Sequence, residues 1–98
     1  MARPEKFALK VPAAVGVGAP SVVFRFRSKT VQVFGTFVAT LQLEGTLAGD
    51  EYFPIGPAVT APGAIEVPET IEFLRVRVTA FTSGEPKAVF AGFDERAW

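Results

Sequence analysis

The sequence predicts an all-β fold, an antiparallel β-sandwich of jelly-roll type with seven or eight strands. Apolar residues alternate with polar ones at a period of two in several segments, which is typical of half-buried strands. Eight prolines and nine glycines divide these segments at a spacing of about 8–12 residues, as turns do in small sandwiches. No segment shows a sustained helical period. We expect one domain over residues 1–98, with an N-terminal arm (1–4) and a C-terminal tail (94–98).

The first half of the chain is expected to contain four strands, at 7–11, 21–27, 31–37 and 39–44. The first ends at Pro12, and the Gly-rich segment 13–20 that follows predicts a loop. Residues 28–30 predict a turn. Gly35 predicts a bulge or a close backbone approach within the strand 31–37.

The second half is expected to contain four more strands, at 52–55, 64–67, 73–81 and 87–93. Pro54 predicts that the segment 52–55 lies at a sheet edge, because proline cannot donate to a central ladder. The clearest alternation lies in 73–81, where Leu74, Val76, Val78 and Ala80 are expected to point inward.

Two pairs of arginines lie on the expected outward faces of strong strands. In 21–27, Val22, Phe24 and Phe26 are expected in the core, which leaves Val23 and the arginines outside. If the two strands are neighbours, the arginines form one basic stripe suited to an acidic protein surface. The alternative is cross-strand pairing with Glu44 or Glu72. The four arginines are Arg25, Arg27, Arg75 and Arg77.

Composition narrows the functional classes. Ten basic and ten acidic residues give a net charge of zero, so we expect neither a nucleic-acid nor a membrane partner. The chain has no Cys and no His, and therefore lacks thiolate ligands and an imidazole base for a serine nucleophile. A Ser–Lys arrangement would need Lys29 or Lys87 to be desolvated, and both are expected in turn regions. Its carboxylates fall mainly in turns and on outward positions. We expect no enzymatic activity, no cofactor and no metal, and the polar start of the chain predicts no signal peptide.

Exposed aromatic and terminal residues are the remaining candidates for contacts with a partner. Tyr52 and Phe53 lie beside a glycine turn, where they could contact a sugar or a protein. Trp98 at the chain end, beside Phe93, is a candidate intermolecular anchor, because tryptophan often dominates interfaces; folding back onto its own domain is the alternative. In the N-terminal segment, Arg3 and Phe7 are the candidates for contact with a partner.

Several segments resemble small β-sandwich virion accessory proteins of tailed bacteriophages, of the capsid decoration or cement type. The resemblance rests on Val31-x-Val33-x-Gly35-Thr36-Phe37, on Leu41-Gln42-Leu43-Glu44-Gly45-Thr46, on Gly49-Asp50-Glu51-Tyr52-Phe53, and on the segment 73–84. It implies a structural protein made in the host cytoplasm that binds the major capsid protein on the outer capsid surface, as a homotrimer. It supplies no catalytic residues. The alternatives are a glycan- or receptor-binding module of a head fibre or tail, and a neck or tail structural component.

Overall fold

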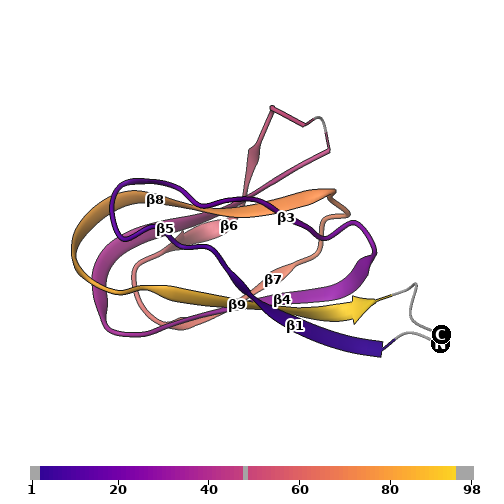
Figure 1. Cartoon of the computed structure of the whole chain (residues 1–98), viewed down its shortest axis with the longest axis horizontal. Helices are drawn as coiled ribbons and strands as arrows, with labels where there is room; N and C mark the ends of the chain where they lie inside the picture. The colour runs from indigo at the N-terminus through magenta and orange to yellow at the C-terminus, as the bar shows by residue number, and fades with distance from the viewer. Residues whose placement is uncertain (1–2, 48, 95–98) are drawn as a thin grey trace.

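The computed structural model describes residues 3–47 and 49–94, and they form two antiparallel β-sheets packed face to face (Figure 1). The described residues contain nine strands and no helix. In chain order these are β1 (Arg3–Leu9), β2 (Gly16–Val17), β3 (Ser21–Val22), β4 (Phe26–Phe34), β5 (Phe37–Thr46), β6 (Phe53–Val59), β7 (Gly63–Val67), β8 (Phe73–Gly84) and β9 (Lys87–Asp94). The predicted β-sandwich is confirmed, with nine strands instead of seven or eight, and the jelly-roll type stays a prediction.

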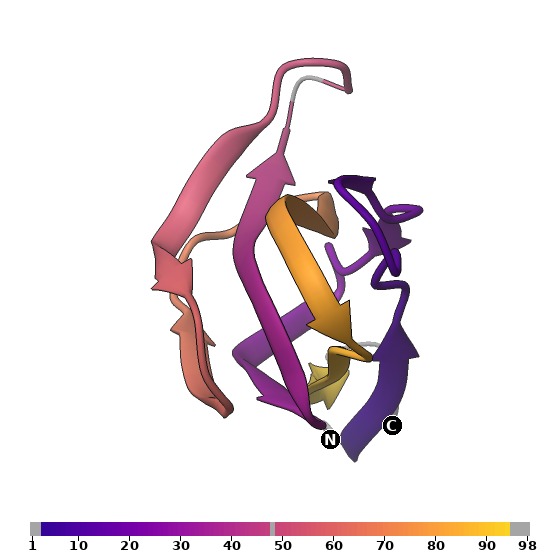
Figure 2. The same ribbon diagram turned by 90° about the vertical axis from the view of Figure 1, so that its left-hand side faces the viewer.

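The two sheets are built from different strands. The first has the order β1-β9-β4-β7, and the second has the order β2-β8-β5-β6, with β3 also paired to β8. The N-terminal segment that carries β2 and β3 therefore lies along one side of β8 (Figure 2). At the other edge, β6 contains two prolines, Pro54 and Pro57, which agrees with the predicted edge position.

The core lies between the sheets and is built from the inward residues of the alternating strands. Leu74, Val76 and Val78 of β8 are buried, as predicted. Three phenylalanines from β1, β4 and β9 pack together at the first sheet. The ring centroids of Phe7 and Phe90 lie 4.8 Å apart, and those of Phe26 and Phe90 lie 5.1 Å apart. Such aromatic pairs stabilise a core beyond the area that they bury.

The predicted strand 21–27 is wrong in its middle. β3 ends at Val22, and the chain then turns from the second sheet into the first, with the amide of Phe26 donating to the carbonyl of Val23. This turn reverses the expected faces: Val23 is fully buried, whereas Val22 and Phe24 are exposed. Phe26 is buried as expected, because it already belongs to β4 in the first sheet.

Two further expectations are corrected by the turns and pairings of the chain. Gly35 does not interrupt one strand but lies between β4 and β5, with φ at 98°. A Cβ there would lie 2.6 Å from the carbonyl oxygen of Glu85, so the close backbone approach that was predicted is present. In β8, register shifts against β5 turn Ala80 outward, where an inward side chain was expected.

The expected arm and tail are also partly strand. β1 begins at Arg3, because Arg3 and Pro4 pair with Asp94 and Phe93 of β9. Asp94, expected to begin the tail, is the last residue of β9 and is buried. The rest of the tail, with Trp98, lies outside the described residues.

Candidate functional site

Two of the predicted arginines form a charged cluster with Glu44 on the outer face of the second sheet. The Nε atoms of Arg75 and Arg77 donate to the two carboxylate oxygens of Glu44, at 2.8 and 2.9 Å. The register places Glu44 directly opposite Arg75, so the pairing follows from strand alternation. The alternative of cross-strand pairing with Glu44 is therefore confirmed for this pair of arginines.

Within the cluster, Arg75 and Glu44 are more buried than Arg77. The side chain of Arg75 is 17% exposed, that of Glu44 is 13% exposed, and that of Arg77 is 41% exposed. The guanidinium of Arg75 also lies 3.6 Å from the centroid of the Tyr52 ring. Arg75 thus covers one face of Tyr52, which does not favour stacking of a sugar on that ring.

The other two arginines lie elsewhere, so the basic stripe does not form. Arg25 follows β3 in the turn between the sheets, and its Nε donates to Asp94 at 2.8 Å. Arg27 lies in β4 of the first sheet, with its guanidinium 5.2 Å from the ring centroid of Phe93. Because β4 and β8 belong to different sheets, the condition for the stripe is not met.

An exposed apolar surface lies along the segment that pairs with β8. We call it the apolar strip, and it consists of Val15, Val17, Val22 and Phe24. Phe24 is 59% exposed, which is unusual for a phenylalanine in a small domain. Two backbone amides hold the segment in place: that of Gly18 donates to the carbonyl of Val76 in β8, and that of Val23 donates to the carbonyl of Glu72 just before β8. The strip is therefore anchored by its backbone, while its side chains remain in solvent.

The sequence interpretation missed this strip because it treated 13–20 as a loop and placed Phe24 in the core. The signal that was available is the run of valines in a segment interrupted by Gly16, Gly18 and Pro20. Such a segment cannot form a long regular strand, so its apolar side chains cannot all turn inward. Near the end of the strip, Val22, Phe24, Arg25 and Glu72 line a surface depression of about 350 Å³.

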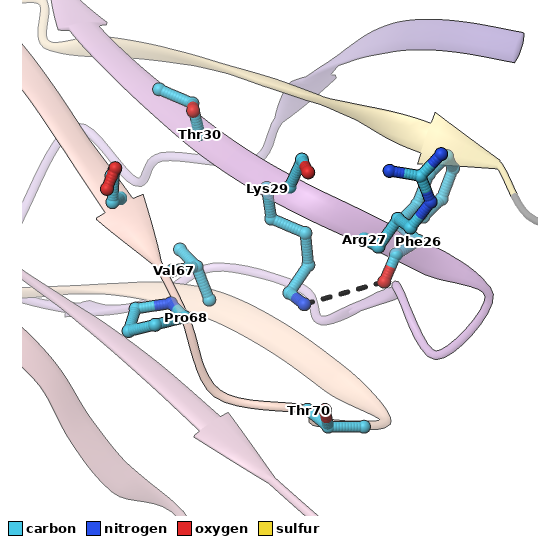
Figure 3. Close-up of a pocket in the computed structure, with 9 residues that line it drawn as sticks. Phe26, Arg27, Lys29, Thr30, Val67, Pro68 and Thr70 are labelled. Atoms are coloured by element: carbon cyan, nitrogen blue, oxygen red, sulfur yellow. Dashed lines mark hydrogen bonds between the residues drawn. The ribbon is translucent and has the colours of Figure 1, made fainter. Parts of the chain in front are cut away.

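A second feature is a cavity of about 310 Å³ at the start of β4 and the end of β7 (Figure 3). Lys29 lines it and extends toward the segment that carries Thr70, with its Nζ 3.5 Å from the carbonyl oxygen of Phe26. The residue is only 6% exposed. Burial lowers the pKa of Lys29 from its ordinary value of 10.5, while the nearby charge of Glu69 acts in the opposite direction.

The remaining predicted contact residues are divided between surface and core. Arg3 and Phe93 are exposed on β1 and β9, and Phe53 is exposed on the edge strand β6. Phe7 packs in the aromatic cluster with Phe90, so it serves the core of this chain. Trp98 lies outside the described residues.

Within residues 3–47 and 49–94, no group of three acidic side chains is placed to hold a metal ion. The same part of the chain has no helix long and apolar enough to cross a membrane.

The described residues form a small β-sandwich with an exposed apolar strip. No protein-family model matches the sequence, and no curated protein matches it. Among solved structures, the chain is similar to the crystal structure of SPBc2 prophage-derived protein YomS, with a TM-score of 0.81. The match covers 96% of each chain at 13% sequence identity, and it shows that the two chains share a fold over nearly their whole lengths.

Proposed function

We propose that this chain is a structural protein of a tailed bacteriophage particle, and specifically a decoration protein that binds the major capsid protein on the outer surface of the head. The observation that carries the proposal is the shared fold, over nearly the whole of both chains, with a prophage-derived protein. The sequence resemblance to small virion accessory proteins points to the same class independently. In this role the chain reinforces the capsid and has no catalytic activity.

The apolar strip supplies the contact that such a role requires. Exposed apolar patches on small proteins mark interaction surfaces, and Phe24 provides an aromatic anchor of the kind that dominates binding energy. The zero net charge removes long-range repulsion between neighbouring copies on a lattice. Assembly as a homotrimer would strengthen the contact, because one bound copy raises the local concentration of the other two.

Two edge strands of the sandwich, β6 and β1, contain prolines that disfavour pairing with a further strand. β6 carries Pro54 and Pro57, and β1 carries Pro4, so these edges lack amides that a further strand would need. A decoration protein that must stay dispersed until it meets a capsid benefits from edges of this kind.

The test is cosedimentation of the purified protein with capsids of its source virus, with the bound copies counted by quantitative mass spectrometry. We expect saturable binding, with hundreds of copies per particle. Phe24→Ser should weaken binding at least tenfold, whereas Phe34→Ser, on the other sheet, should bind as the unaltered protein does. A particle that carries far fewer copies would favour a neck or tail component. Absence of binding to any form of the capsid would refute the decoration role.

Oligomeric state is a separate measurement, made by light scattering coupled to size exclusion. A trimer in solution supports docking at three-fold positions. A monomer that forms trimers only on the capsid lattice keeps the role but moves trimer formation to the surface of the head.

A further inference from the structure

Lys29 is turned into the sandwich by a β-bulge. On β4, Arg27 pairs with Phe93 and Thr30 pairs with Ala91, so two residues of β4 face the single residue Gly92 of β9. A Cβ on Gly92 would lie 3.3 Å from the carbonyl oxygen of Arg27, which shows how closely the bulged strand approaches β9 there.

The backbone of the bulge adopts an uncommon conformation. Ser28 has φ at 53°, in the left-handed region that residues other than glycine rarely adopt. The extra residue shifts the alternation of β4, so that Lys29 shares the inward side with the buried residues Val31 and Val33. Local backbone strain of this kind gathers at functional sites.

The charge of nearby Glu69 compensates only part of the effect of burial on the ammonium of Lys29, because the pKa of Lys29 is still lowered. It can donate three hydrogen bonds, and within residues 3–47 and 49–94 it makes one, a long contact to the carbonyl of Phe26. Removing a charged group from water without good partners destabilises a fold. An apolar side chain at this inward position would be the more stable choice, so the presence of lysine indicates a role other than stability.

Three residues that carry hydroxyl groups are among those that line the same cavity. Ser28 and Thr30 of β4 line it together with Lys29, and Thr70 lines it from the segment before β8. We propose that this cavity binds a carboxylate group, with the ammonium of Lys29 as its counter-ion and hydrogen-bond donor. Charge-assisted hydrogen bonds of this type are stronger than neutral ones. The proposal does not depend on the virion role.

The charges at the rim favour a carboxylate over a phosphate. Glu66 lines the cavity and Glu69 acts on Lys29 from nearby, and both are exposed. These two negative charges repel a dianion more strongly than a monoanion. The volume is at the lower limit of ligand pockets, which suits a small group or a single side chain.

The first experiment titrates sodium acetate into the isotopically labelled full chain at neutral pH and constant ionic strength, followed by nuclear magnetic resonance. We expect saturable shifts, with half-saturation in the millimolar range, at the amides of Ser28, Thr30 and Thr70 and at the Nζ of Lys29. Sulfate should not produce them. Absence of a saturable acetate shift at the Nζ of Lys29 in the unaltered protein would overturn the proposal, and this readout needs no variant.

Two variants then test the ammonium. Lys29→Met should abolish the acetate shifts at the other cavity residues. Lys87→Met is the matched control, because Lys87 is exposed and does not line this cavity, and it should keep them. Retention of the acetate shifts by folded Lys29→Met would overturn the proposal.

A second probe identifies the source of the carboxylate. The blocked tripeptide acetyl-Ala-Glu-Ala-amide presents a glutamate side chain as a partner protein would. Binding at least tenfold tighter than that of acetate indicates a side chain of a protein partner. Equal binding indicates a small free carboxylate, and both outcomes support the site.

Discussion

The Glu44 cluster should stabilise the second sheet unequally through its two arginines. The pair with Arg75 is largely enclosed, so its charge-assisted hydrogen bond is expected to contribute about 1.5–3 kcal/mol. Arg77 is 41% exposed at its side chain, so solvent screens its pair with Glu44, which should contribute about 0.2–1 kcal/mol. Both pairs use the same carboxylate, so one substitution removes the charge that serves them.

Glu44→Gln keeps the shape of the side chain and removes its charge. We expect it to lower the free energy of unfolding by about 2 kcal/mol, which corresponds to a fall in Tm of roughly 8–16 °C for a domain of this size. Glu51→Gln is the matched control, because Glu51 is exposed in the connection to β6, and it should stay within about 0.5 kcal/mol of the unaltered protein.

Double-mutant cycles separate the two arginines. Thermal or urea unfolding of Arg75→Met and Arg77→Met is measured with Glu44 and with Gln at that position, which cancels the separate contact of Arg75 with Tyr52. We expect the coupling of Glu44 to Arg75 to exceed its coupling to Arg77 by about 1 kcal/mol, from the ranges for enclosed and exposed pairs. Equal or reversed couplings would refute the assignment of strength by burial.

Three further substitutions test the core, a turn and the buried ammonium. Phe90→Ala should cost about 3–5 kcal/mol in urea unfolding, because it empties the centre of the aromatic cluster; a cost below about 1 kcal/mol would contradict that position. Gly84→Ala should cost more than about 1 kcal/mol in thermal unfolding, since its φ is 93° and a Cβ would collide with the backbone of Thr36; an unchanged Tm would argue against this turn. Lys29→Met should raise the free energy of unfolding by about 1–2 kcal/mol at neutral pH. Burial lowers the pKa of Lys29 in the folded chain below its ordinary value of 10.5. Between the folded and the unfolded pKa the unfolded chain binds more protons, so the unaltered protein gains stability as pH rises through this range. Urea unfolding at neutral and alkaline pH should show that Lys29→Met lacks this gain.

Local alternation predicted the parts of the fold in which one strand face is buried. Leu74, Val76 and Val78 could be placed correctly from sequence because β8 is central in its sheet and regular over that stretch. Alternation failed where the backbone departs from a period of two, as it does at Ala80, which the register shifts against β5 turn outward.

The spacing of the apolar residues around the β4 bulge is irregular, and the prediction from sequence explains it by a turn at 28–30 instead of a bulge. Phe26 and Val31 are separated by an odd number of positions, so both can be buried on one strand only if an extra residue shifts the register. Treating 28–30 as a turn removed this conflict, and with it the reason why Lys29 points inward.

Pairing between distant segments could not be predicted from alternation. The four arginines have similar local patterns, yet two meet Glu44 and two lie near the chain crossing between the sheets. Which strands become neighbours depends on the packing of the whole sandwich, in which the ladders join segments such as β5 and β8 that are far apart along the chain. The outward position of Arg75 and Arg77 was therefore predictable from the sequence. Whether they would face an acidic partner protein or pair across strands with Glu44 or Glu72 was not.

The two unusual surfaces of the molecule are connected through the same pair of segments. The depression beside Phe24 includes Arg25 and Glu72, and the Lys29 cavity includes Phe26 and Thr70, so each surface uses the crossing from β3 to β4 and the connection from β7 to β8. If one partner covers both surfaces, the two contacts act together. The apolar contact would then supply binding energy, and a carboxylate on Lys29 would supply directional specificity. Because the strip is held through backbone amides and the cavity through a bulge, Phe24→Ser and Lys29→Met alter one surface each, which allows the two contributions to be measured separately.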